Sequence, residues 1–381
     1  MTFKRLALLI QAGTVITMLQ AQVNPLDQEA HHPLHLIATP DSSQPFGYTP
    51  DQVHHAYGFD QIANQGDGQV IGIVDGFDVP NLESDLAVFD STFGLPECTV
   101  ANGCLTIVFA NGVRPTQNAN WSLETSLDVQ WAHAIAPNAK IVLVESKNGT
   151  LGSLLGAVSV AVKNGANVVS MSWGSLNEFS LETVLDQFLF SNSAVTYIAA
   201  SGDSGHNLFG YPAASPLVVA VGGTTLKLDS IGNVLNETAW FGSGGGLSNF
   251  YPQPAYQNGF QTSGFRGIPD VAYNANPITG VPVYNSQHGN WLEVGGTSAG
   301  SPQWAALTAI ANSLRASSGK STIGSSFHQA VYSNPLDFFD IVKGLNGFCG
   351  ALCTTAGGYD LVTGLGSPIA QNLVYALVSA P

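Results

Sequence analysis

One serine lies in a segment suited to nucleophilic catalysis. The segment reads Gly296-Thr297-Ser298-Ala299-Gly300 and is followed by an apolar, helix-forming run at 303–315. Small residues on both sides of Ser298 permit a sharp turn and the close approach of a substrate backbone. The following helix would direct free N–H groups and its positive end toward negative charge developing on a substrate. Ser298 is therefore a candidate nucleophile.

The same segment fits the Gly-x-Ser-x-Gly turn of α/β-hydrolases, but the rest of their triad is missing. Those enzymes place an acid and then a histidine after the serine. Here the only histidine after Ser298 is His328, and residues 299–327 contain no aspartate or glutamate. A second signature, Gly202-Asp203-Ser204-Gly205, resembles the nucleophile loop of chymotrypsin-like peptidases. It follows a buried strand in a β–α–β pattern, however, whereas those peptidases are all-β proteins.

Ser298 needs a base, and the sequence offers two carboxylates in place of a histidine. None of the nine histidines lies in the context that subtilisin-like enzymes give their catalytic imidazole. Glu124 and Asp128 lie four residues apart, on one face of a helix predicted at 121–136. That helix has no lysine or arginine and is apolar on nearly every side. A solvated acidic face is the alternative, but two partly buried carboxyls do not ionise together easily, so at least one pKa should rise toward that of a usable base.

Short apolar runs alternate with longer helix-forming stretches and would position these residues. The strands are predicted at 70–74, 141–144, 168–172, 195–199 and 218–221, and the helices at 121–136, 151–163, 181–191 and 301–315. Continuous β-branched runs separated by helices predict an α/β fold with a mostly parallel central sheet and helices on both faces. Residues 241–290 are rich in glycine, proline and asparagine, and we expect long loops with irregular strands there.

Composition excludes several classes of function. Of 381 residues, 45% are apolar and 10% charged, a balance opposite to that of disordered chains. Eleven basic residues face 26 acidic ones, giving a net charge of −15. Such a surface repels phosphates and anionic lipids, so no nucleic acid and no membrane surface is expected as a partner.

The N-terminus has the layout of a secretory signal peptide. Two basic residues precede an apolar run at 6–19, and a small residue, Ala21, closes a short polar stretch. We therefore predict a signal peptide at 1–21, a short extension at 22–47 and a secreted protein without a membrane span; a buried N-terminal helix is the alternative. Residues 31–50 are rich in proline and histidine and are expected to be extended.

The four cysteines form two local pairs, Cys98 with Cys104 and Cys349 with Cys353. Export makes disulfides permissible, and each bond would close a small loop. Zinc is the competing interpretation, but neither spacing is Cys-x2-Cys and no histidine cluster accompanies either pair. Two disulfides are the prediction.

Together, these motifs resemble the sedolisins, the serine-carboxyl peptidases. The likeness runs from about Tyr48 to the C-terminus, so 48–381 would be one peptidase domain. Its motifs occur in order: Glu124-x3-Asp128, Ala136-Pro137-x-Ala139, Ser172-Trp173-Gly174, Ser201-Gly202-Asp203-Ser204-Gly205, Glu237-Thr238-Ala239-Trp240, Pro269-Asp270-Val271, Gly296-Thr297-Ser298-Ala299 and Thr363-Gly364-Leu365-Gly366-Ser367-Pro368. The resemblance implies a subtilisin-like fold in which a glutamate replaces the catalytic histidine, and activity at acid pH.

The resemblance also implies a role for each site residue. Ser298 would be the nucleophile, Glu124 its general base, Asp128 the residue that holds and polarises Glu124, and Asp203 part of the oxyanion hole. Acid chemistry agrees, because a histidine with a pKa of about 6.5 is only about 0.3% neutral at pH 4, whereas a glutamate near 4.3 is about one third ionised. Asp203 must be protonated to donate to an oxyanion. Asp75, at the end of the first strand, is left outside the triad.

A segment near the C-terminus resembles the family's calcium loop. The side chains of Asp340 and Asp360 and the carbonyls of Ile341, Ala356 and Gly358 would bind one structural Ca²⁺. Carboxylates and carbonyls suit a hard cation that takes oxygen ligands. Two ordinary turn aspartates are the alternative.

The expected activity is that of a secreted, monomeric, acid-acting endopeptidase on protein or peptide substrates. Residues 172–174 would pair with substrate backbone as an added strand. A tripeptidyl-peptidase of the same family and a non-catalytic binding protein on this scaffold are the alternatives. Typical sedolisins carry a long folded propeptide, whereas about 25 residues separate Ala21 from Tyr48 here, so we do not expect removal of a large prodomain.

Overall fold

The computed structural model describes residues 24–37 and 42–381, and the predicted signal peptide at 1–21 lies outside them. The helices are α1 Pro50–Tyr57, α2 Leu82–Phe93, α3 Ala119–Ile135, α4 Leu151–Lys163, α5 Glu182–Leu189, α6 Gly300–Ser317, α7 Phe327–Tyr332 and α8 Ala370–Ser379. The strands are β1 His35–Ile37, β2 Val70–Gly76, β3 Leu105–Phe109, β4 Lys140–Ser146, β5 Val168–Met171, β6 Thr196–Ala200, β7 Val218–Leu228, β8 Val234–Ala239, β9 Gly246–Pro252, β10 Phe265–Ile268, β11 Val271–Asn274, β12 Val281–Asn285, β13 Asn290–Gly295, β14 Phe338–Phe339 and β15 Ser367–Pro368.

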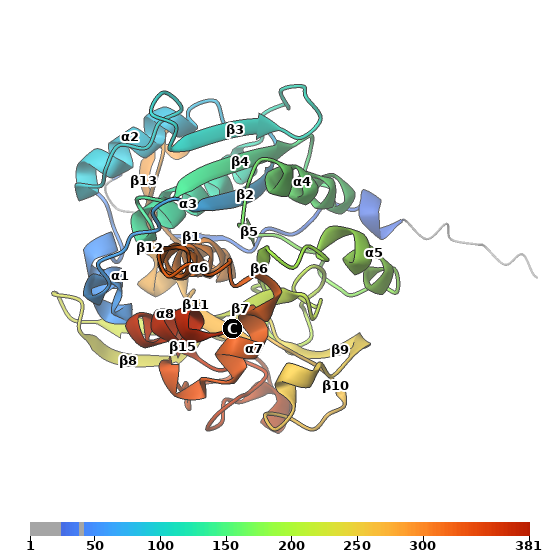
Figure 1. The fold of residues 1–381 in the computed structure, drawn as a ribbon. Helices are drawn as coiled ribbons and strands as arrows, with labels where there is room; N and C mark the ends of the chain where they lie inside the picture. Colours follow the sequence, from blue (N-terminus) through green and yellow to red (C-terminus); the bar gives the residue numbers. More distant parts are fainter. Residues whose placement is uncertain (1–23, 38–41) are drawn as a thin grey trace, which may run out of the picture.

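A central sheet carries the fold (Figure 1). Its strands follow the order β11-β7-β6-β5-β2-β4-β3 and pair in parallel, and β8 adds to β7 in the antiparallel sense. This confirms the predicted α/β fold with a mostly parallel sheet. All five predicted strands form, four of them within two residues of their expected bounds, whereas the strand predicted at 218–221 continues to Leu228 as β7.

Alternating side chains of these strands face two separate layers of helix. Ile141 and Leu143 of β4 pack into a core shared with α3 and α6, whereas Val142 and Val144 pack into a core shared with α4. Because both faces are covered, the strands are continuous apolar runs rather than alternating ones. All four predicted helices form, as α3, α4, α5 and α6.

Residues 241–290 hold more regular structure than expected. They contain β11, which lies in parallel register with β7 from Val271↔Val221 to Asn274↔Thr224 and completes one edge of the central sheet. The Asp270 carboxylate fixes this edge, because it accepts a hydrogen bond from the backbone of Ala220 at 2.9 Å. A four-residue strand among turn residues has too little periodicity to be recognised from the sequence.

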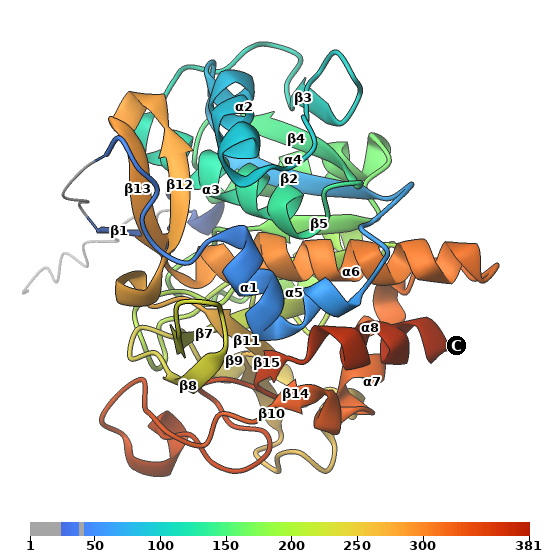
Figure 2. The ribbon, with the colours of Figure 1, turned by 90° about the vertical axis from the view of Figure 1, so that its left-hand side faces the viewer.

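A second, three-stranded sheet lies beside the central one and includes the N-terminal segment. β12 and β13 form an antiparallel hairpin, and β1 joins β13 with His35 opposite Gly295 and Ile37 opposite Glu293. Figure 2 shows β1 alongside this hairpin, next to the start of α6. Part of the segment predicted to be merely extended is therefore an edge strand.

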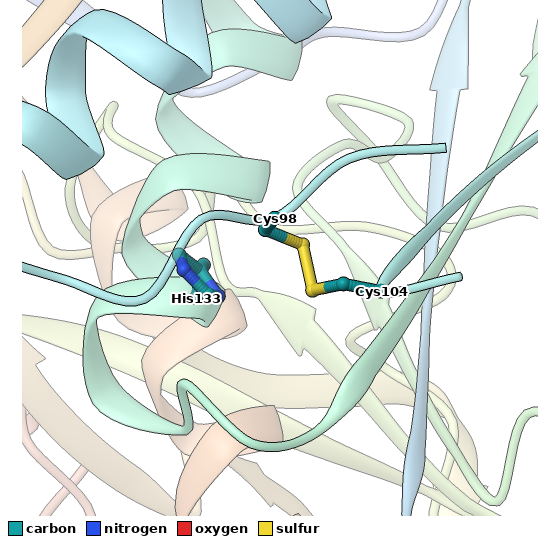
Figure 3. Close-up of side chains that lie close together, drawn as sticks. All are labelled: Cys98, Cys104 and His133. Atoms are coloured by element: carbon teal, nitrogen blue, oxygen red, sulfur yellow. A yellow bond between two sulfur atoms is a disulfide. The ribbon is translucent and has the colours of Figure 1, made fainter. Parts of the chain in front are cut away.

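Both predicted disulfides form, Cys98–Cys104 and Cys349–Cys353. The fold nevertheless brings a histidine to each pair, which the spacing of residues does not reveal. His133 of α3 lies beside the first (Figure 3), and His206 lies within ligand distance of the second. Since the sulfur atoms are bonded to each other, neither group offers a thiolate to zinc. In the described part of the chain, no helix combines the length and hydropathy that crossing a bilayer requires.

Candidate active site

The candidate site lies at the carboxyl ends of the parallel strands. β4 and β5 lie on opposite sides of β2, so the order in which successive strands join the sheet reverses at β2. A crevice at such a switch point is where α/β sheets bind ligands. Asp75 is the last residue but one of β2, Ser172 follows β5 and Asp203 lies in the loop after β6, so three chain-distant polar residues meet at this edge.

Ser298 lies at the same edge of the sheet, in the connection between β13 and α6. It lies in a single 3-10 turn, Thr297–Ala299, directly before the helix begins. Gly296 enters this turn with φ 120°, a conformation that favours glycine. The Ser298 hydroxyl is fully buried, and its Oγ donates a long hydrogen bond of 3.5 Å to the carbonyl of Ser172.

Glu124 and Asp128 project into the site from α3. Asn118 caps this helix by accepting hydrogen bonds from the N–H groups of residues 120 and 121. Both carboxyls are fully buried, as the apolar surroundings of the predicted helix require. Asp128 Oδ1 accepts a hydrogen bond of 2.8 Å from the hydroxyl of Ser172, which links α3 to the strand end beside Ser298. The α3 helix thus brings the predicted base and its neighbour to the predicted nucleophile.

Burial governs the ionisation of these carboxyls. It raises the pKa of Glu124 above its usual value, while the His32 ring and the Ser298 hydroxyl beside it act in the opposite direction. The pKa of Asp128 is raised further, by burial and then by the charges of Asp75 and Glu124. No well-aligned hydrogen bond reaches either Glu124 oxygen from the described residues. Catalytic hydrogen bonds in ligand-free sites are often long and tighten when substrate binds.

Asp75 belongs to the same cluster, although the sequence interpretation left it out. Burial raises its pKa well above the usual range, and the charge of Glu124 adds to the rise. The neighbouring Thr125 side chain acts in the opposite direction and lowers this pKa. Three neighbouring buried carboxyls cannot all ionise, so they share protons and titrate as a group. The position of Asp75 at a strand end was the signal that could have included it.

Asp203 contacts the turn that carries Ser298. Its Oδ1 accepts two hydrogen bonds of 2.8 Å, one from the backbone N–H and one from the hydroxyl of Thr297. Its Oδ2 has no hydrogen bond of ordinary geometry within the described ranges. The carboxyl is thereby oriented with one oxygen directed at the space beside Ser298. Thr297 was not identified from the sequence, although it stands directly before the predicted nucleophile.

The N-terminal segment also enters this site. His32 Nδ1 lies 3.4 Å from Glu124 Oε2, and His35 Nε2 lies 3.2 Å from Asp203 Oδ2. The backbone of His31 pairs with Gly174, its N–H donating to the Gly174 carbonyl at 2.8 Å and its carbonyl accepting at 2.9 Å. Gly174 belongs to the stretch predicted to pair with substrate backbone. These contacts join segments more than 90 residues apart, and no local pattern indicates them.

The predicted calcium ligands lie together near the C-terminus. Asp340 follows β14, and its Oδ2 accepts a hydrogen bond of 2.8 Å from the N–H of Gly358. Asp360 Oδ2 accepts one of 3.1 Å from the N–H of Ala356. Both carboxyls therefore meet one loop, with Ile341 fully buried beside it. Burial raises the pKa of Asp360 to about 6, and this carboxylate-and-carbonyl set suits a hard cation.

Comparisons with known proteins agree with this geometry. Residues 108–332 match the model of the subtilase family. Kumamolisin of Bacillus sp. (strain MN-32) is 35% identical in an alignment covering 90% of this chain and 65% of kumamolisin. Tripeptidyl-peptidase 1 of Dictyostelium discoideum is 30% identical, over 76% of this chain and 52% of its own length.

A solved structure is similar throughout. Pseudomonas sedolisin, a serine-carboxyl proteinase complexed with two molecules of pseudo-iodotyrostatin, superposes with a TM-score of 0.74 and 27% sequence identity. The match covers 87% of this chain and 98% of that one. The chain thus spans nearly all of this solved relative but less than two thirds of the two curated relatives above.

Proposed function

The chain belongs to the subtilase family and, within it, to the sedolisins; from that premise we propose that it is an acid-acting serine-carboxyl endopeptidase that hydrolyses proteins and peptides. One observation carries the proposal: Ser172 links the two sides of the site, because its carbonyl accepts a hydrogen bond of 3.5 Å from the buried Ser298 hydroxyl while its own hydroxyl donates one of 2.8 Å to the buried carboxyl of Asp128 on α3. A carboxylate whose pKa is raised by burial is a usable base in acid, where an imidazole would already be protonated and could not accept a proton.

In the proposed mechanism, Ser298 Oγ attacks the substrate carbonyl and Glu124 takes the hydroxyl proton. Asp128 supports Glu124 from the next turn of α3 and is oriented by its hydrogen bond from Ser172. Glu124 then gives the proton to the leaving amine, and an acyl-enzyme remains on Ser298. Water, activated by the same carboxylate, releases the acyl group.

The developing oxyanion is stabilised by two donors in this proposal. One is the backbone N–H of Ser298 at the start of the turn into α6. The other is a proton on Asp203 Oδ2, because Oδ1 already accepts two hydrogen bonds from Thr297. Donors fixed in place before the reaction stabilise the transition state without reorganisation.

His32 is the competing base, since its imidazole lies between the N-terminal segment and Glu124. No hydrogen bond connects this ring to the Ser298 hydroxyl in the described structure; that hydroxyl donates to the Ser172 carbonyl. Our proposal therefore expects His32→Ala to retain peptidase activity. Loss of about 10⁴-fold in kcat, as expected for removal of a catalytic base, would assign the role to the imidazole.

The main test is a casein or haemoglobin digest scanned from pH 2 to 8. We expect activity confined to acid pH, and its loss in Ser298→Ala and in Glu124→Ala. The exposed Glu97→Ala serves as the matched control and should keep full activity. Full activity of Glu124→Ala would refute the proposed base.

Endopeptidase action is favoured over tripeptidyl release by the length of the cleft. The Pro33 carbonyl accepts from the N–H of Ser298, and the chain continues N-terminally through His31 to Ala30, whose N–H donates to Gly149 at 2.8 Å. Glu29 then pairs with Thr150. A strand thus extends at least four residues before Pro33, where a tripeptidyl-peptidase must block the substrate N-terminus. Mass spectrometry of products from a long peptide tests this, since internal fragments are expected rather than successive tripeptides.

We propose in addition that the enzyme is secreted and binds one structural Ca²⁺. Secretion is supported by the basic and apolar pattern of residues 1–21. It is tested by N-terminal sequencing of protein recovered from the culture medium. Calcium is supported by the convergence of Asp340 and Asp360 on a single loop.

A further inference from the structure

Residues 242–246, Gly-Ser-Gly-Gly-Gly, lie between two loops that are far apart in the chain. On one side this glycine segment binds residues 201–207, the loop that carries Asp203. On the other side it binds the loop that holds the proposed calcium ligands, at residues 346 and 362. A run of glycines is typical of a flexible turn, but hydrogen bonds hold this one on both sides.

The glycine segment is bonded closely to the loop that carries Asp203. Four hydrogen bonds of 2.7–2.9 Å join the two, and they hold the chain both before and after Asp203. The donor and acceptor pairs are Ser201 Oγ with Gly244 O, Gly244 N with Gly202 O, Gly205 N with Gly242 O, and Asn207 N with Gly245 O. A side chain on Gly244 would collide with the Ser201 carbonyl oxygen, so this close approach requires glycine. The backbone on both sides of Asp203 therefore takes its position from the glycine segment.

One buried residue, Asn346, connects three segments at this place. Its Nδ2 donates a hydrogen bond of 2.8 Å to the carbonyl of Ser243 in the glycine segment. Its backbone carbonyl accepts a hydrogen bond of 2.9 Å from the N–H of His206, and its own N–H donates to the carbonyl of Cys353 at 2.9 Å. Because Cys353 is bonded to Cys349, Asn346 ties the glycine segment and the loop of His206 to a loop closed by a disulfide.

Ser243 is the residue on which the Asn346 amide acts. Its side chain is fully buried, and its Oγ accepts a hydrogen bond of 2.8 Å from the N–H of Gly223 in β7. The same Oγ donates one of 2.7 Å to the carbonyl of Val362. Together with the Asn346 amide, these bonds fix the glycine segment at its second residue. A buried carbonyl that loses its donor is costly, so removal of the amide would drive the segment to shift.

We propose that Asn346 is a positioning residue for the oxyanion hole, because it fixes, through the glycine segment, the loop that carries Asp203. This inference rests on the proposed function for the role of Asp203 as a hydrogen-bond donor. Thr297 orients the Asp203 carboxyl, but the distance from its Oδ2 to a substrate carbonyl at Ser298 depends on where the loop backbone lies. A donor stabilises the transition state only where charge develops, and a displacement of about 1 Å can cost about 10²-fold in rate.

Steady-state kinetics at pH 3 with a soluble peptide test this role. In Asn346→Ala we expect kcat to fall about tenfold with KM nearly unchanged, because the lost interaction acts mainly in the transition state. Asn346→Asp has the same shape, and most of its carboxyl is protonated at pH 3, so it can donate to the Ser243 carbonyl and should recover most of the loss. An unchanged kcat in Asn346→Ala, or an aspartate variant no more active than the alanine variant, overturns the proposal.

Asn312→Ala is the matched control. Asn312 is also buried, and its side chain accepts a hydrogen bond of 2.8 Å from the N–H of Ile323, far along α6 from the turn that carries Ser298. The substitution should lower stability and leave kcat unchanged. A fall in kcat equal to that of Asn346→Ala would show that any lost buried asparagine slows the enzyme, and would overturn the proposal.

The dependence on Asp203 is tested by a double-mutant cycle. If Asn346 acts through Asp203, adding Asn346→Ala to Asp203→Ala leaves kcat where Asp203→Ala alone has placed it. Independent effects would multiply, and the double variant would then be slower by about a further tenfold. That further fall would overturn the proposal.

Hydrogen exchange followed by mass spectrometry tests the contacts without requiring activity. In Asn346→Ala, peptides covering residues 201–207 should exchange about tenfold faster than in the unmodified chain, whereas Asn312→Ala should leave their exchange unchanged. Equal exchange in Asn346→Ala and the unmodified chain overturns the proposal. If exchange rises as expected but the unmodified chain digests nothing between pH 2 and 8, the hold of Asn346 on the loop stands and the peptidase assignment falls.

Discussion

At the scale of single residues, the site depends on how buried carboxyls hold their protons. Asp203 is the clearest case, because its two oxygens have different surroundings. Oδ1 is saturated by the two donors of Thr297, whereas Oδ2 meets only the ring of His35 in the described structure. A proton on this carboxyl would therefore reside on Oδ2 and point toward the carbonyl being attacked.

Asp203→Ala should reduce kcat by about 10²–10³ while changing KM little, because a donor to the oxyanion acts mainly in the transition state. Steady-state kinetics with a soluble peptide at acid pH measures both constants. Asp203→Asn retains a donor in the same place and should recover part of the loss. An unchanged kcat in Asp203→Ala would remove this residue from the mechanism.

Asp75→Asn should shift the acid limb of the pH–kcat/KM profile to lower pH. The charge of Asp75 raises the pKa of Asp128, and its own pKa is raised by Glu124, so removing one carboxyl lets the other two ionise at lower pH. The profile is measured with the same peptide between pH 2 and 7. Asp60→Asn, an exposed substitution in the 3-10 turn Phe59–Gln61 directly after α1, provides the control. A profile that does not move would show that Asp75 has no part in the shared titration.

The residue types of the site were predictable, but their connections were not. Glu124, Asp128, Asp203 and Ser298 are visible in the sequence because each lies in a short motif of restricted composition. The contacts of His32 and His35 depend instead on a segment that returns across the sheet edge. Long-range pairing of this kind follows from the whole fold and leaves no periodic signal in the segment itself.

At the scale of elements, the loop between β14 and β15 is where a ligand would contribute to stability. Its two carboxyls approach the same turn, and one of them, Asp360, is buried without a cationic side chain among its hydrogen-bond partners. A bound divalent cation would compensate this charge. Its binding energy would then appear as stability of the folded chain.

Removing calcium with a chelator at pH 7 should lower Tm by about 4 °C. An ion held at 100 times its Kd contributes about 2.7 kcal/mol, and an unfolding entropy of about 2.1 cal/mol/K per residue means that each kcal/mol shifts the Tm of a domain of roughly 330 residues by about 1.4 °C. Differential scanning calorimetry with and without chelator measures the change. Asp340→Asn should have a low Tm that no longer responds to chelator. A wild-type Tm insensitive to chelation would refute the calcium site.

Elements were predictable where the chain repeats a simple pattern over enough residues. β2, β4 and β6 are continuous apolar runs, and α3 and α6 are long and nearly free of charge, so each was recognised. β11 and β1 have four and three residues and take their partners from distant segments. Short strands of this kind are defined by the sheet edge that they join, and their own residues carry too little information.

At the scale of the whole molecule, acidic side chains outnumber basic ones, and many of them are buried. The net charge of −15 makes the surface self-repelling at neutral pH. Inside, burial raises the pKa of Glu182 to about 9, and those of Glu145 and Asp90 to about 7. Asp270 is the exception: burial opposes its ionisation, but Arg266 outweighs that effect and holds its pKa below the usual range. Most buried carboxyls therefore favour the folded state in acid.

The free energy of unfolding should fall as the pH rises from about 4 to about 8. A carboxyl with a raised pKa binds a proton in the folded chain between its unfolded value near 4 and its folded value, so the unfolded state binds fewer protons across this range. Each such proton lowers the stability by about 1.4 kcal/mol per pH unit while the difference persists. Urea unfolding at fixed calcium, followed from pH 4 to 8, measures this dependence.

Glu182 contributes to this decline over the widest pH range, because its pKa is raised further than those of Glu145 and Asp90. Its oxygen accepts a hydrogen bond of 2.8 Å from the N–H of Phe179, which a glutamine oxygen can accept equally well. Glu182→Gln should therefore keep the stability at pH 4 and flatten its decline above pH 5. Glu83→Gln is the matched control, because Glu83 on α2 is only half-buried and also accepts a hydrogen bond from a backbone N–H, that of Val100 at 2.9 Å; it should leave the decline unchanged. If the free energies of unfolding of the two variants decline in parallel as the pH rises, burial of Glu182 is not the cause of the greater stability in acid.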